Sequence, residues 1–159
     1  MGLKKEIEGF KKLAIVGVGS EIRNDDGVGI HVVNELKARI KNPAVECLIG
    51  GTAPENLTGV LKRIKPSHVL LIDAAGTGQQ PGTITLIEPS RIKSGGFSTH
   101  TLSLKELAAY LEQEIKATVF VLGIEPKDIN FGEELSPEVR RGAEEAVELV
   151  IAVCHNINP

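Results

Sequence analysis

Short apolar runs alternate with longer amphipathic runs along most of this chain. The apolar runs predict strands buried in a sheet, and they span residues 13–17, 45–49, 69–73, 83–87 and 119–123. The longer runs predict amphipathic helices over about 26–40, 54–64, 102–115 and 136–156. No repeat, linker or low-complexity segment interrupts this alternation, which is typical of one α/β unit.

The connection between the third and fourth strands determines the direction of the fourth. Only nine residues, 74–82, separate them, which is fewer than a parallel crossover helix requires. The fourth strand is therefore expected to be antiparallel and to lie at an edge. The pattern predicts a three-layer α/β sandwich, with helices on both faces of a mixed, mostly parallel five-stranded sheet that has one antiparallel edge strand.

Composition narrows the class of protein. The length of 159 residues suits a single domain, and the net charge of -3 with a pI near 5.8 argues against nucleic acid or an anionic membrane as partner. Cys47 and Cys154 both lie in apolar runs, so we interpret them as reduced core residues. The chain carries no apolar signal segment and no run of about 18 apolar residues, so we expect a cytoplasmic protein without membrane insertion.

Three segments that carry candidate catalytic or metal-binding residues lie at the predicted carboxyl ends of strands, where open α/β sheets bind ligands. The first is the loop 17–29, in which Asp25 and Asp26 stand at a helix start among four glycines. Carboxylates at that position can simply stabilise the helix dipole. Four glycines in thirteen residues instead indicate unusual dihedral angles or a close approach of another backbone.

The other two segments contain Asp73 and His100. Asp73 ends the apolar run VLLID, where a carboxylate needs a hydrogen bond, a metal or a substrate to offset its burial. His100 precedes an amphipathic helix, a position where a histidine can also be merely structural. If Asp26, Asp73 and His100 converge, two carboxylates and one imidazole form an incomplete ligand set for a borderline divalent metal.

Motifs of other enzyme classes are absent or incomplete. The first loop matches two glycines of the dinucleotide fingerprint, but Ile22 stands at the third, and Gly50 and Gly51 end the second strand where an acid would bind ribose. The chain has no P-loop, no H-E-x-x-H and no G-x-S-x-G motif. Neither cysteine lies near a loop histidine in this arrangement, so a cysteine nucleophile is not expected.

Five segments in order resemble the hydrogenase maturation endopeptidases, especially the hydrogenase-3 type. The loop GVGSEIRNDDGVG is similar to the family's opening motif G-N-x-L-x-x-D-D-G-x-G, and the resemblance extends over roughly residues 13–155. The other matching segments are GGTAPEN, VLLIDAA with PGTITLIEP, STHTLSL and VFVLGIEP. Ser20 and Ile22 depart from the usual Asn and Leu, which puts a specific Asn contact in doubt but not the metal ligands.

The resemblance implies a function and a set of site residues. Such proteases remove a short C-terminal peptide from the nickel-loaded large-subunit precursor of a [NiFe] hydrogenase. The family's metal-contacting positions fall on Asp26, Asp73 and His100, and Asp26 or Asp73 is the candidate base for attack by water. Nickel is then supplied by the substrate precursor, and no tightly held metal is expected in the free enzyme.

The resemblance also suggests domain boundaries, and it leaves two alternative functions open. Residues 1–12 are interpreted as an N-terminal extension and 13–157 as the peptidase core of a single domain 1–159, expected to be a monomer. A maturation chaperone that senses nickel without cutting, and another hydrolase on a similar fold such as the spore germination protease group, remain open. Cleavage of a nickel-loaded precursor distinguishes both from the endopeptidase.

Overall fold

The computed structural model describes residues 2–92 and 101–155. Five strands form one sheet: β1 (Leu13–Val18), β2 (Val45–Gly51), β3 (His68–Ala74), β4 (Ile84–Ile87) and β5 (Thr118–Ile124). The α-helices are α1 (Leu3–Ile7), α2 (Val28–Arg39), α3 (Thr58–Ile64), α4 (Thr101–Ile115) and α5 (Pro137–His155). Short 3-10 helices lie at Asn24–Gly27, Pro54–Leu57 and Pro89–Arg91.

The strand order is β2-β1-β3-β5-β4, and only β4 runs antiparallel to its neighbour. The predicted mixed sheet with one antiparallel edge strand is confirmed. After β1 the chain reaches β2 on one side and then crosses back to β3 on the other side of β1. This reversal creates a switch point between the carboxyl ends of β1 and β3, where α/β sheets bind ligands.

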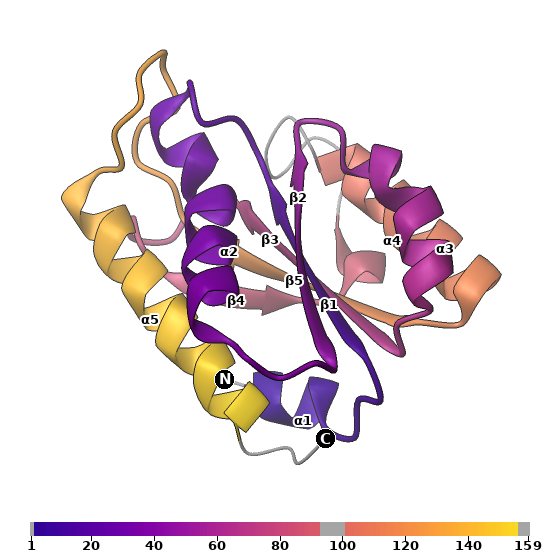
Figure 1. The fold of residues 1–159 in the computed structure, drawn as a ribbon. Coiled ribbons are helices and arrows are strands. Elements are labelled where there is room, and N and C mark those ends of the chain that lie inside the picture. The colour runs from indigo at the N-terminus through magenta and orange to yellow at the C-terminus, as the bar shows by residue number, and fades with distance from the viewer. Residues whose placement is uncertain (1, 93–100, 156–159) are drawn as a thin grey trace.

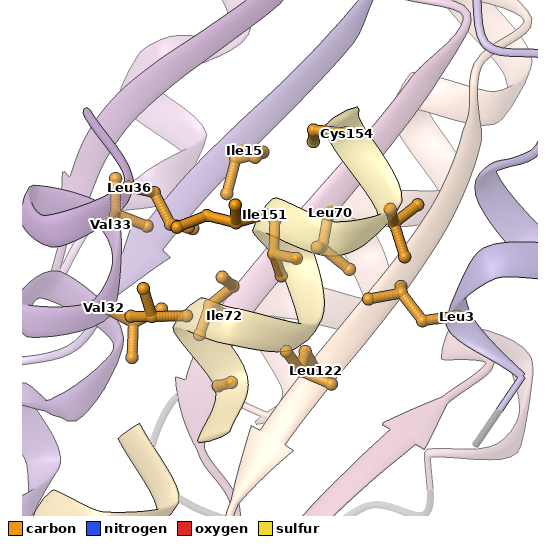
Figure 2. Close-up of a cluster of buried hydrophobic side chains, with 14 of the residues drawn as sticks. Leu3, Ile15, Val32, Val33, Leu36, Leu70, Ile72, Leu122, Ile151 and Cys154 are labelled. Carbon is orange, nitrogen blue, oxygen red and sulfur yellow. The ribbon is translucent and has the colours of Figure 1, made fainter. Parts of the chain in front are cut away.

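The sheet separates two hydrophobic cores, which gives the predicted three layers (Figure 1). Helices α1, α2 and α5 cover one face, and α3 and α4 cover the other. Every residue of β1 is buried because β1 is covered on both faces, and this explains its uninterrupted apolar sequence. Figure 2 shows Ile15, Leu70, Ile72 and Leu122 of the sheet packed beneath side chains of α2 and α5.

The amino-terminal residues take part in the core on the α5 side. Leu3 and Ile7 of α1, together with Phe10, are buried in the same cluster as α2 and α5. Burying an apolar side chain of this size contributes about 1.5–3 kcal/mol relative to leaving it in water. The division into an extension and a peptidase core stays a prediction, but residues 3–10 stabilise the folded unit.

Both cysteines are free thiols, and burial explains their chemistry. Cys154 is buried in α5 (Figure 2), and Cys47 of β2 packs against the same cluster. Burial raises the pKa of Cys47 to about 11 and the pKa of Cys154 to about 12. Neither is a thiolate near neutral pH, which agrees with their interpretation as core residues. Within the described ranges, no helix is long and apolar enough to cross a membrane.

Candidate functional site

The candidate site lies where β1 and β3 end side by side. Gly17 of β1 is opposite Ile72 of β3, so the residues that follow each strand emerge at the same edge of the sheet. From β1 the chain enters the loop that carries Asp26, and β3 carries Asp73 as its penultimate residue. The topology therefore brings both predicted carboxylates to one edge.

Asp26 is held by a loop that turns back on itself. The backbone N–H of Ser20 donates to Oδ2 of Asp26 at 3.0 Å, and the N–H of Asp26 donates to the carbonyl oxygen of Arg23 at 3.0 Å. Residues Asn24–Gly27 form a 3-10 turn, and α2 begins at Val28 with Gly27 as its N-cap. The predicted helix start at Asp26 is therefore two residues early, and Asp26 does not occupy the capping position of α2.

Asp73 is buried at the end of a central strand, and Gly19 brings it close to the first loop. Oδ1 of Asp73 accepts from the N–H of Ala74 at 2.8 Å. A Cβ on Gly19 would lie 3.6 Å from that oxygen and would overlap the carbonyl oxygen of Asp26. Gly19 also has φ +130°, which side chains disfavour. The expected close approach of backbone in this glycine-rich loop is confirmed here, and it places the Asp26 backbone beside Asp73.

His100, the third predicted ligand, lies outside the described residues. The proposed set of Asp26, Asp73 and His100 thus stays a prediction. Among residues 2–92 and 101–155 there is no group of three or more histidine, cysteine or acidic residues that could hold a metal ion. Asp26 and Asp73 supply two carboxylates at this edge.

Asp25 has a structural role that its sequence position does not reveal. It is fully buried, and its Oδ2 accepts from the N–H groups of Lys127 and Asp128 at 2.9 and 2.8 Å. The N–H of Ser136 donates to Oδ1 at 2.7 Å, and the Ser136 hydroxyl donates to Oδ2 at 2.8 Å. Four hydrogen bonds therefore fix the loop between β5 and α5 against the loop that carries Asp26.

Glu125 is another buried carboxylate, and the sequence analysis did not single it out. Its Oε1 accepts from the N–H and hydroxyl of Thr77, both at 2.8 Å, and from the N–H of Gln79 at 3.3 Å. These bonds hold the start of the β3–β4 connection, directly after Asp73. The signal was available, because Glu125 follows the apolar run of β5 as closely as Asp73 ends that of β3.

Two buried carboxylates at one edge of a sheet can act in two ways. A carboxylate can accept a proton from water as a general base, or it can bind a divalent metal through oxygen. Asp26 is 4% exposed and Asp73 is 1% exposed, so both are largely desolvated, which strengthens their interaction with a nearby cation. The arrangement therefore suits hydrolysis or metal binding.

Comparisons with known proteins identify the family. A model of the hydrogenase maturation protease family matches residues 30–153. A putative hydrogenase maturation protease of Methanocaldococcus jannaschii is 36% identical over 98% of this chain and 95% of that protein. The hydrogenase 3 maturation protease of Escherichia coli is 30% identical over 80% of this chain and 81% of that protein.

Solved structures show the same architecture. The crystal structure of the [NiFe] hydrogenase maturation protease HycI from Thermococcus kodakarensis superimposes with a TM-score of 0.90. It is 28% identical to this chain, and the match covers 98% of this chain and 99% of that chain. By sequence and by fold, this chain belongs to the hydrogenase maturation protease family.

Proposed function

We propose that this chain is an endopeptidase that removes the C-terminal extension of a nickel-loaded [NiFe] hydrogenase large-subunit precursor. Family membership supports peptide hydrolysis in hydrogenase maturation. The observation that carries the proposal is the pair of buried carboxylates, Asp26 and Asp73, at the switch point beside Gly19. The free thiols Cys47 and Cys154 support a reducing compartment, and we place the reaction in the cytoplasm.

Nickel enters this reaction with the precursor. Asp26, Asp73 and His100 together offer two carboxylates and one imidazole, which leaves coordination positions open for ligands of the precursor. Such a set suits recognition of a metal already held by another protein better than permanent retention of a catalytic zinc, for which histidine-rich sets are more usual. The free enzyme is therefore expected to hold no tightly bound metal.

The carboxylates provide the proton chemistry of the cleavage. Asp26 or Asp73 accepts a proton from a water molecule as the water oxygen bonds to the scissile carbonyl carbon. The carbon–nitrogen bond then breaks, and the amine of the departing tail takes up a proton. Binding of the precursor's nickel near the same carboxylates positions the scissile bond for this attack.

Processing of a defined precursor tests the proposal. The enzyme is treated with EDTA, desalted and mixed with precursor that either contains or lacks nickel, and the shortening of the large subunit is followed by electrophoresis and intact mass. We expect cleavage of the nickel-loaded precursor only. Efficient cleavage of the nickel-free precursor contradicts nickel recognition, and activity that EDTA abolishes and zinc alone restores indicates an ordinary metallopeptidase.

Variants of Asp26 and Asp73 test whether these carboxylates are needed for cleavage. Asp73→Asn and Asp26→Asn are expected to abolish cleavage, whereas Glu35→Gln, which changes an exposed carboxylate on α2, is expected to cut normally. Binding without cleavage by the unmodified chain would instead identify a nickel-sensing chaperone. Normal cleavage by either aspartate variant would remove that residue from the mechanism.

A further inference from the structure

Three large apolar side chains are exposed on the two loops next to Asp26. Ile22 is 56% exposed, Ile129 is 41% exposed and Phe131 is 85% exposed. Single exposed apolar residues are common on protein surfaces, whereas a group of them marks a site of interaction. We refer to Ile22, Ile129 and Phe131 together as the apolar lip.

Hydrogen bonds between the two loops bring these residues together. The N–H of Gly132, next to Phe131, donates to the carbonyl oxygen of Ile22 at 3.0 Å. Arg23 Nε donates to the carbonyl oxygen of Ile129 at 3.2 Å. Residues 22–24 and 129–132 therefore run side by side, with Arg23 and Gly132 paired in a parallel bridge, and these two segments carry all three apolar side chains.

The backbone beneath the apolar lip is firmly held. Asn24 adopts φ +46°, and its side-chain Oδ1 accepts from the N–H of Glu134 at 3.2 Å. Gly132 has φ +154°, and a Cβ there would overlap the Asn24 side chain. The four hydrogen bonds to Asp25 anchor both ends of the 127–136 segment. Phe131 is thus held in water by an ordered backbone, which lowers the entropic cost of using it as an anchor.

The apolar lip is continuous with the candidate site. Ile22 and Asp26 lie in the same loop, which the Ser20–Asp26 and Asp26–Arg23 hydrogen bonds close. A precursor that brings its scissile bond to Asp26 must therefore approach the apolar lip as well.

We infer that the apolar lip docks into an apolar depression on the folded body of the large-subunit precursor, beside the scissile bond. The inference rests on the proposed function. A side chain that is 85% exposed buries most of its area in a concave surface, which a folded body offers more readily than an extended tail. Exposed Glu21, Glu133 and Glu134 border the apolar lip in sequence, so the rim of that depression is expected to be neutral or basic.

Steady-state processing kinetics of a nickel-loaded precursor test the inference. Phe131→Ser is expected to raise KM about tenfold, as for an interface hot spot, and to change kcat by less than about twofold. The thermal midpoint should not fall, because Phe131 is 85% exposed. Ile129→Ser and Ile49→Ser form a matched pair, since both isoleucines are 41% exposed, and only Ile129→Ser should raise KM.

Competition distinguishes the folded body from the tail. A large subunit that is genetically truncated at the cleavage site should inhibit the wild type and should inhibit Phe131→Ser at least several-fold more weakly. A synthetic peptide of the tail should inhibit both equally. An unchanged KM for Phe131→Ser while the wild type cuts normally refutes the inference alone, as does inhibition by the tail peptide that depends on Phe131. Failure of the wild type to cut refutes the proposed function instead.

Discussion

Substitutions of the consecutive aspartates Asp25 and Asp26 are expected to have different effects. The Asp25 variant should lose mainly stability, and the Asp26 variant should lose mainly processing activity. Asp25→Asn keeps the shape of the side chain but removes its charge and one of its acceptor oxygens. At Oδ1 the bond from the Ser136 N–H is lost, and at Oδ2 three charge-assisted bonds become neutral ones. Asp26→Asn, in contrast, can still accept the bond from the Ser20 N–H.

The magnitude follows from this count of hydrogen bonds. Bonds to charged groups contribute about 1.5–3 kcal/mol and neutral ones about 0.5–1.5 kcal/mol, so the one lost bond and the three weakened bonds sum to about 6 kcal/mol. The lower desolvation cost of a buried amide offsets part of this, which leaves a net loss of about 2–4 kcal/mol. For a domain of this size that corresponds to a fall in thermal midpoint of about 5–15 °C. Asp26→Asn should lose about 1 kcal/mol in stability but at least 100-fold in processing rate.

The assay measures both properties on the same preparations. Urea unfolding followed by circular dichroism gives the free energy of unfolding, and cleavage of nickel-loaded precursor well below the unfolding temperature gives the rate. The reasoning is refuted if Asp25→Asn is as stable as the wild type. It is also refuted if Asp26→Asn unfolds more readily than Asp25→Asn while cutting at the wild-type rate.

Three further predictions concern single positions. Gly19→Ala should abolish processing and lower the thermal midpoint, because the new Cβ overlaps the Asp26 carbonyl; a normal rate would contradict the close approach. Burial lowers the pKa of His68, so its neutral form is favoured in the folded state, and stability should fall as pH drops below about 6.5, the unfolded value. His68→Gln should reduce that fall between about pH 7 and 5 in urea titrations, and equal slopes would exclude the effect. Cys47 and Cys154 should react with a thiol reagent at pH 8 only after unfolding, since burial raises their pKa values to about 11 and 12; rapid reaction of the folded protein would contradict this.

Much of the fold and part of the site could be predicted from local pattern. β1 is apolar throughout and β3 is apolar from Val69 to Ile72 because helices cover both faces, and the nine-residue connection after the predicted third strand excluded a parallel crossover. Asp73 could be singled out because a carboxylate at the end of a buried apolar run needs a partner, whereas the choice of Asp26 over Asp25 came from the family resemblance.

Other features depend on residues that are far apart in sequence. The hydrogen bonds of Asp25 span from 102 to 111 residues, so its role differs from that of Asp26 for reasons that no local pattern contains. Glu125 likewise holds residues 46 to 48 positions away. The burial of α1 beneath α5 also required the assembled core.

The sequence by itself determined the mostly parallel sheet, its antiparallel edge strand and the edge at which two carboxylates emerge, because periodicity and connection length are local properties of the chain. Only the tertiary structure decided that Asp25 anchors the β5–α5 loop, and that the segments carrying Ile22, Ile129 and Phe131 are hydrogen-bonded to one another. The physical reason is that buried polar groups must find hydrogen-bond partners, and in this protein those partners come from segments that meet only when the chain is folded.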